Sequence, residues 1–162
     1  MQVVNKKTNL LSREETSDLF DVCYNNLPNT VLNSKNYSEL STSNYKEEWI
    51  NEIINEENGI CLIYSNGEMF VGFVIIYLKE SENFIREFQI LKQFQDDGKT
   101  FYEMIKLALP FTDTSKIYTG IIYEENRSAI KSFENLGVGI IKGKYQIKYD
   151  LLKKMLDKKT NK

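Results

Sequence analysis

The chain has 162 residues, a formal net charge of −2 and no histidine. This length suits one domain with its own hydrophobic core, and the small charge argues against nucleic acid as a main partner. The absence of histidine excludes Ser–His and Cys–His nucleophilic pairs and removes a common metal ligand, so we expect no metal site. Any proton transfer must use carboxylates, tyrosines, lysines or water.

The predicted location of the protein is cytoplasmic. The first residues lack the apolar stretch and cleavage site of a secretory signal. The longest apolar run, Met69–Leu78, is about half of the roughly 20 residues that a membrane-spanning helix needs. Cys23 and Cys61 fit no metal spacing and are expected to be reduced thiols. We therefore expect neither a membrane partner nor a disulfide.

The N-terminal part is predicted to contain a strand, two helices and a loop. Ser12 and Glu15 have the spacing of a capping box, which opens a helix. A second helix carries Trp49 and three isoleucines on one face. The predicted ranges are a strand at Val3–Val4, a helix from Ser12 to about Asn26, a polar loop over Pro28–Ser43 and a helix over Tyr45–Glu57.

From residue 59 onward, strands and helices are predicted to alternate. Val71–Leu78 is apolar at both alternations, which is typical of a central strand covered on both faces. Asn66-Gly67 is a hairpin turn signal, and Asn126 and Gly137 suit the N-cap and C′ positions of a helix. The predicted strands are Gly59–Ser65, Met69–Lys79, Phe84–Phe94, Ile117–Tyr123, Val138–Lys142 and Tyr145–Leu151, and the predicted helices are Gly98–Phe111 and Asn126–Leu136.

This order of elements predicts an α/β (α+β) fold. Its sheet is mixed and mostly antiparallel, with one parallel strand–helix–strand crossover at its centre and helices on its flanks. No repeat or linker divides the sequence, so residues 1–152 are expected to form one domain and residues 153–162 a frayed, lysine-rich tail. The tail lysines are expected to favour solubility rather than to bind nucleic acid.

The segment after strand 84–94 is predicted to bind phosphate. Residues 95–100, Gln-Asp-Asp-Gly-Lys-Thr, join this strand to the N-terminus of a helix through a glycine-bearing turn. Such a joint directs several unpaired backbone N–H groups and the positive end of the helix dipole toward one point.

This turn and the helix that begins at Asn126 together resemble the GNAT-type N-acetyltransferases. That family carries a Gln/Arg-x-x-Gly-x-Gly/Ala turn after its fourth strand, which Gln95–Thr100 matches. Its helix after the fifth strand carries Asn-x-x-Ala-x-x-x-Tyr-x-x-x-Gly-Phe. Here Asn126, Ala129 and Gly137 match, and Phe133 stands in the place of the Tyr. The order of elements also fits, so the resemblance covers nearly the whole chain.

The resemblance implies an acetyl-CoA site between the fourth and fifth strands. These strands would lie parallel and splay at their C-terminal ends, and the pantetheine arm would pair with the backbone of strand 84–94. The pyrophosphate would lie on the amides of the turn, and a substrate amine would attack the thioester directly, with backbone amides stabilising the oxyanion. The implied cofactor-binding residues are Phe88, Gln89, Ile90, Gln95, Asp96, Asp97, Gly98, Lys99, Thr100, Phe101, Asn126 and Phe133.

Several residues of the turn depart from the family's pattern. Thr100 replaces the final Gly/Ala and adds bulk where the backbone approaches phosphate. Asp96 and Asp97 place carboxylates beside the pyrophosphate, and Lys99 offsets part of that repulsion. The alternative role of Asp97 is the N-cap of the following helix.

Both places that the family uses for proton transfer hold apolar residues. Phe133 replaces a tyrosine that often protonates the leaving thiolate, and Ile121 stands where members that acetylate protein N-termini have a glutamate base. Glu87 and Tyr123 are the candidate catalytic substitutes; the alternatives are a solvated or capping carboxylate and a strand-edge tyrosine. A free thiolate, with a pKa of about 8 to 9, can also leave unassisted.

Three hypotheses of function remain open, and the third is a pure interaction module with no CoA site. The first is an N-acetyltransferase that moves an acetyl group from acetyl-CoA to a primary amine of a small molecule or peptide. The segment 27–58 would select this acceptor, with Tyr37 and Tyr45 as candidate walls of its pocket. The alternative is a catalytically silent relative that binds acyl-CoA or a protein partner without turnover. The protein could act as a monomer or a homodimer.

Overall fold

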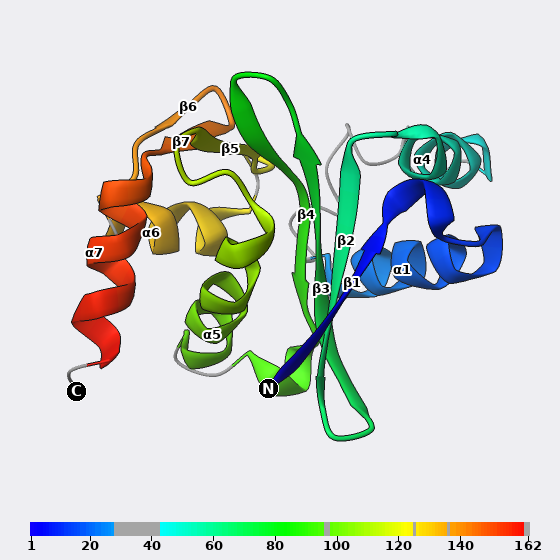
Figure 1. Ribbon diagram of the computed structural model, residues 1–162, viewed down its shortest axis with the longest axis horizontal. Coiled ribbons are helices and arrows are strands. Elements are labelled where there is room, and N and C mark those ends of the chain that lie inside the picture. Colours follow the sequence, from blue (N-terminus) through cyan, green and yellow to red (C-terminus); the bar gives the residue numbers. More distant parts are fainter. Residues whose placement is uncertain (28–42, 96–97, 125, 136, 161–162) are drawn as a thin grey trace.

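The computed structural model describes residues 1–27, 43–95, 98–124, 126–135 and 137–160 (Figure 1). The strands are β1 (Gln2–Lys7), β2 (Gly59–Asn66), β3 (Met69–Leu78), β4 (Glu82–Ile90), β5 (Ile117–Ile121), β6 (Ile140–Ile141) and β7 (Lys144–Ile147). The helices are α1 (Arg13–Asn26), α4 (Ser43–Asn55), α5 (Lys99–Ala108), α6 (Arg127–Asn135) and α7 (Tyr149–Thr160). Short 3-10 turns cover Thr8–Leu10, Lys92–Phe94 and Leu109–Phe111.

All of these strands belong to one sheet, in the order β1-β2-β3-β4-β5-β7-β6. The β4–β5 pair is parallel and the other neighbours are antiparallel. Helix α5 makes the crossover between the two parallel strands. The predicted fold class, a mixed and mostly antiparallel sheet with one parallel crossover, is therefore confirmed.

Helices cover both faces of the sheet, with α1 and α4 on one side and α5, α6 and α7 on the other (Figure 1). Strand β3 is buried from Val71 to Tyr77, as its doubly apolar sequence predicts. Its side chains alternate between the two layers: Phe73 and Ile75 pack with Trp49 of α4, while Val74 and Ile76 pack with Met104 of α5. The α1/α4 side and the α5 side thus have separate hydrophobic clusters.

The predicted helix ends of α1 and α6 are confirmed in atomic detail. The Ser12 side chain accepts a hydrogen bond from the Glu15 N–H, and the Glu15 carboxylate accepts one from the Ser12 N–H. At the end of α6, Gly137 adopts φ +77°. The Gly137 N–H donates to Glu134 and the Val138 N–H to Phe133, which is a Schellman motif.

Two predicted elements end earlier than expected, because the chain tightens into a 3-10 turn. Strand β4 stops at Ile90 rather than Phe94, since Lys92–Phe94 form such a turn. Helix α5 stops at Ala108, and Leu109–Phe111 continue as a 3-10 turn. Pro110 has no N–H to continue the α-helical pattern.

The expectation of a frayed C-terminal tail is wrong. Strand β7 ends at Ile147 rather than Leu151, and α7 continues through the expected boundary at residue 152 as far as Thr160. Leu152 and Met155 are only 4% and 7% exposed. The reason is their spacing of three, which places both on one apolar stripe of a helix.

Part of the predicted loop over Pro28–Ser43 lies outside the described residues, including Tyr37; Ser43 itself is the first residue of α4. In the described ranges, no helix is both long enough and apolar enough to span a membrane.

Candidate functional site

Strands β4 and β5 separate soon after they pair. Their parallel register begins at Glu82 and Ile117 and ends at Ile85 and Gly120. Strand β4 nevertheless continues to Ile90, still paired with β3 on its other side. Within the described part of the chain, the β4 edge from residue 86 to residue 90 therefore has no strand partner on the side of β5. The splay implied by the resemblance is present.

A β-bulge lies where the two strands separate. Ile75 and Ile76 of β3 are adjacent, but their partners in β4 are Glu87 and Ile85, so Arg86 is an extra residue. A bulge bends its strand and breaks the alternation of side chains. As a result, Arg86 and Glu87 both contact α4, through Glu52 and Trp49 respectively.

The bulge supports a network of charges between β4 and α4. The Arg86 guanidinium donates to both Glu52 oxygens at 2.8 and 3.0 Å and to Glu87 Oε1 at 2.8 Å. Burial disfavours ionised Glu52, but the bonds from Arg86 and from the Tyr77 hydroxyl outweigh it and lower the pKa of Glu52. Burial and the Glu52 carboxylate raise the pKa of Tyr77. The network therefore favours ionised Glu52 and Arg86 beside a neutral tyrosine.

The two predicted catalytic residues lie in the same neighbourhood. Glu87 is 17% exposed and also accepts hydrogen bonds from Trp49 Nε1 at 3.3 Å and Gln89 Nε2 at 3.2 Å. Tyr123 follows β5 and is 40% exposed. Partial burial, then Tyr45, then the charge of Glu87 raise the pKa of Tyr123. The structure thus brings Glu87, Tyr123 and Tyr45 together on the α1/α4 side.

Cys23 of α1 also lies near Glu87. Burial, followed by the Glu87 charge, raises the pKa of this thiol well above its usual value. A thiol with a raised pKa stays protonated at neutral pH and is a poor nucleophile.

The predicted phosphate turn leads into α5 with Gly98 at the N-cap and φ +80°. The N-cap is thus Gly98 rather than Asp97, because this left-handed conformation suits glycine. Asp96 and Asp97 lie outside the described residues. Lys99 is exposed in the first turn of α5, and Thr100, the next residue, is buried.

Two amide side chains bind the carbonyl of Ile90, one of the predicted pantetheine partners. Gln95 Nε2 donates to it at 2.8 Å and Asn26 Nδ2 at 3.0 Å. The Asn26 amide also donates to Gln89 Oε1 at 3.3 Å. Backbone groups two residues apart in a strand point the same way, so the N–H and C=O of Phe88 face the open edge of β4.

A row of aromatic rings runs from β4 to β7 on the α5/α6 side. The ring centroids of Phe88 and Phe101 are 5.0 Å apart, those of Phe101 and Phe133 6.4 Å, and those of Phe133 and Tyr145 4.6 Å. Beside this row, Asn126 Oδ1 caps α6 by accepting from the Ala129 N–H at 3.2 Å. The predicted residues Phe88, Phe101 and Phe133 are therefore brought together.

Sequence reasoning missed Tyr145, which ends this row. Tyr145 lies in β7 opposite Gly120 of β5. The signal was present, because a glycine inside a strand often marks the close approach of another group.

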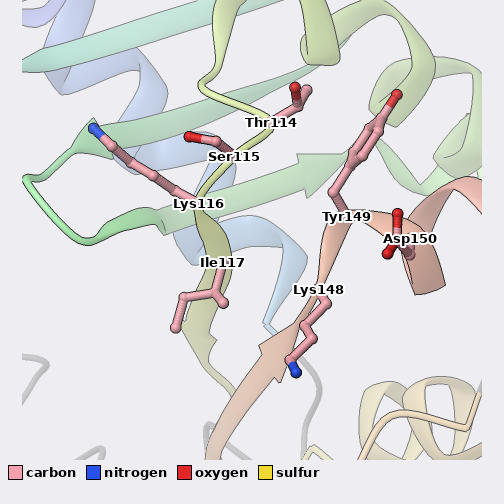
Figure 2. Close-up of a pocket in the computed structure, with 7 residues that line it drawn as sticks. All are labelled: Thr114, Ser115, Lys116, Ile117, Lys148, Tyr149 and Asp150. Carbon is pink, nitrogen blue, oxygen red and sulfur yellow. The ribbon is translucent and has the colours of Figure 1, made fainter.

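The hollow in Figure 2 is separate from this region. It has a volume of about 280 Å³ and lies between the start of β5 and the end of β7, far along β5 from the point of separation. Its two lysines, Lys116 and Lys148, extend away from each other (Figure 2). Lys116 Nζ is also bound to the carbonyl of Lys79 at 3.0 Å. In the described ranges, no group of three or more His, Cys, Asp or Glu side chains could hold a metal.

Solved structures of N-acetyltransferases share this architecture. PaiA N-acetyltransferase from Thermoplasma acidophilum, in complex with coenzyme A, matches with a TM-score of 0.55 and 12% identity, over 91% of this chain and 98% of that one. An acetyltransferase from Thermus thermophilus has a TM-score of 0.60 and 12% identity, over 90% of this chain and 96% of that one. The putative N-acetyltransferase YhhK from E. coli, bound to coenzyme A, has a TM-score of 0.56 and 12% identity, over 91% of this chain and 98% of that one.

The protein therefore has the GNAT, or acyl-CoA N-acyltransferase, fold. At these identities the likeness establishes the fold. No protein-family model matches the sequence. No curated protein matches it either.

Proposed function

We propose that this protein is an acetyl-CoA-dependent N-acetyltransferase whose acceptor is a primary amine. The observation that carries the proposal is the end of β4–β5 pairing at Ile85 and Gly120, while β4 continues toward the N-terminus of α5. The open backbone of Phe88 and the amides of the α5 N-terminus then lie along one path. Two of the structural neighbours are named as complexes with coenzyme A.

The residues along this path suit coenzyme A. An unpaired strand edge offers N–H and C=O groups to the amides of a pantetheine arm. The exposed Lys99 and the helix dipole provide positive charge for phosphates. The row Phe88, Phe101 and Phe133 supplies apolar surface beside the arm. The Asn126 oxygen caps α6, and its amide nitrogen, which makes no hydrogen bond within the described residues, would donate to the ligand.

The acyl thioester supplies an activated carbonyl for attack by an amine. The chain's contribution is to hold the two reactants together and to offer backbone N–H groups to the oxyanion. The amine acceptor would approach from the α1/α4 side, where Glu87, Tyr45 and Tyr123 gather. In this proposal Glu87 or Tyr123 takes part in proton transfer, and the acceptor is a small molecule or a peptide.

A second candidate function is acyl-CoA binding without turnover. Phe133 lies within the aromatic row and has no proton to give, and Ile121 is apolar and 61% exposed. Both positions therefore favour a silent relative that holds acyl-CoA or a protein partner.

Acetyl-CoA titration followed by a turnover assay separates these candidates. We expect acetyl-CoA to raise the melting temperature and to bind in calorimetry, and amines from a panel to release free thiol. Binding without thiol release on any amine would leave only the second candidate. Absence of binding at millimolar acetyl-CoA would contradict both.

A further inference from the structure

Tyr145 differs from the other buried tyrosines in the bonding of its hydroxyl. The hydroxyls of Tyr64, Tyr77 and Tyr118 bond to Met104 O, Glu52 Oε1 and Thr112 Oγ1 at 2.8 to 3.0 Å. Tyr145 is 5% exposed, and its hydroxyl has no hydrogen-bond partner within the part of the chain that the structure describes. A buried hydroxyl without a partner costs roughly 1 to 3 kcal/mol. The hydroxyl therefore keeps a donor and an acceptor that the described residues do not use.

The hydroxyl lies where β4 and β5 separate. Tyr145 is paired with Gly120, and a Cβ added to Gly120 would lie 2.2 Å from the Tyr145 hydroxyl oxygen. The ring therefore extends from β7 across β5, in the direction of β4. Gly120 is also the last β5 residue that pairs with β4. Only a glycine at position 120 leaves room for the hydroxyl at this point.

Aromatic rings pack against Tyr145, and the Glu87 carboxylate of β4 acts on the pKa of its hydroxyl. The Phe133 ring packs on the Tyr145 ring at 4.6 Å, and Phe101 packs on Phe133. Burial and then the Glu87 carboxylate raise the pKa of Tyr145, so the phenol keeps its proton at neutral pH. A neutral phenol is a hydrogen-bond donor as well as an acceptor.

A ligand laid along the open edge of β4 from α5 would end at this hydroxyl. The reactive end of acetyl-CoA is a thioester, whose sulfur gains negative charge as the carbon–sulfur bond breaks. We propose that Tyr145 donates its hydroxyl proton to this sulfur and so acts as the acid for the leaving thiol. This assignment rests on the function proposed above.

The proposed step balances in atoms and electrons. The amine nitrogen forms a bond to the carbonyl carbon, the carbon–sulfur bond breaks, and its electron pair goes to sulfur. Sulfur takes the phenolic proton and leaves as the thiol of coenzyme A. The attacking nitrogen releases one proton, and water returns a proton to the Tyr145 phenolate.

The first test compares ligands rather than rates, and so it needs no acceptor. Coenzyme A and desulfo-coenzyme A differ only in the sulfur, and both can be titrated by calorimetry. The measured quantity is the affinity for coenzyme A divided by the affinity for desulfo-coenzyme A. We expect this ratio to fall about fivefold in Tyr145→Phe, the equivalent of one hydrogen bond. The matched control is Tyr118→Phe, in which the hydroxyl lost is bonded to Thr112; it should keep the wild-type ratio.

The second test measures turnover and stability. Tyr145→Phe should lower kcat about 100-fold, typical of a lost general acid, without raising the KM of the amine. Its melting temperature without ligand should equal or exceed that of the wild type, whereas Tyr118→Phe should melt lower. Gly120→Ala, which displaces the hydroxyl without removing it, should lose turnover to a similar extent.

The outcomes separate the two proposals. If the wild type binds coenzyme A but Tyr145→Phe keeps the wild-type ratio and kcat, the role of Tyr145 is wrong and the proposed function stands. If Tyr145→Phe melts well below the wild type and keeps that ratio, Tyr145 is a packing residue. If the wild type binds neither ligand, the proposed function fails and the assignment of Tyr145 fails with it.

Discussion

Arg86 is the extra residue of β4, and it holds Glu52 and Glu87 close together on the α1/α4 side of the sheet. The Arg86 side chain is 22% exposed, and its guanidinium pairs with both carboxylates at once. Removal of one member of a desolvated ion network costs more than the network contributes, because the remaining charges lose their partner.

We expect Arg86→Met to lower the free energy of unfolding by about 2 to 3 kcal/mol at neutral pH. The matched control is Arg13→Met, since Arg13 pairs with Glu47 on an exposed surface and such pairs contribute about 0 to 1 kcal/mol. Urea denaturation of both variants measures the difference. Equal losses in the two variants would show that the bulge network is no more than a surface ion pair.

The lowered pKa of Glu52 predicts a dependence of stability on pH. Because its folded pKa lies below its unfolded value of about 4.3, Glu52 stabilises the fold above that pH and loses the effect as the pH falls through its folded pKa. Glu52→Gln should therefore flatten the fall in stability between about pH 5 and pH 3. Urea denaturation across this range tests the prediction, which an unchanged slope would contradict.

Helix α5 begins directly after the predicted phosphate turn. Lys99 lies in its first turn and Lys106 in its last, and both are exposed. Lys99→Glu and Lys106→Glu change the net charge by the same amount. Comparing them therefore separates the effect of charge at the N-terminus of α5 from the effect of the net charge of the protein. We expect Lys99→Glu to weaken acetyl-CoA binding about fivefold and Lys106→Glu to leave it nearly unchanged.

Calorimetry at two salt concentrations measures these affinities. The effect of Lys99→Glu should shrink as salt rises, because exposed charges are screened. Equal weakening by both variants would mean that acetyl-CoA senses only the overall charge.

The β6–β7 hairpin depends on a two-residue turn in which Lys142 and Gly143 both have positive φ, +49° and +71°. A Cβ at Gly143 would lie 2.8 Å from the carbonyl oxygen of Ile122, whereas one at Gly67 would meet nothing within 4 Å. Gly143→Ala should therefore cost about 2 to 3 kcal/mol, and Gly67→Ala, with only backbone strain, about 1 kcal/mol. Thermal and urea unfolding check the order, and a larger loss in Gly67→Ala would contradict it.

Elements with local signals were predicted well from the sequence. Ser12 with Glu15, and Asn126 with Gly137, define helix ends through neighbouring residues. The 3-10 turns after β4 and α5 shortened both elements, and the apolar stripe of α7 was obscured by its many lysines. The ends of β4 and α5 and the existence of α7 depended on which side chains become buried. The residue types alone did not predict that burial.

At the scale of the whole molecule, helices on both sides pack on the same strands. Trp49, the single tryptophan, is 2% exposed on the α1/α4 side, while Met104 is fully buried on the α5 side. Both contact clusters that include residues of β3. The two sides should therefore unfold together.

Met104→Ala tests this coupling across the sheet. It should cost about 3 kcal/mol by leaving a cavity on the α5 side. The loss should appear equally in Trp49 fluorescence and in far-UV circular dichroism, because a single cooperative transition moves both. A shift in circular dichroism alone would show that the two layers unfold independently.

The whole-molecule arrangement also explains which parts of the candidate site the sequence revealed. The predicted phosphate turn and the α6 cap are continuous stretches of chain, so the local sequence could point to them. Arg86 with Glu52, and Tyr145 with Gly120, meet only through strand register. No local pattern specifies a bulge opposite Ile75 or the insertion of β7 between β5 and β6.

The position of β7 has a consequence for how the protein is made. Strand β5 emerges from the ribosome before β7, yet β7 is its neighbour on the outer side. Until residues 144–147 have been synthesised, that edge of β5 has no partner, and Tyr145 is absent from the point where β4 and β5 separate. A nascent chain thus contains residues 95–100 well before Tyr145, and the proposed site is completed only after β7 has been synthesised.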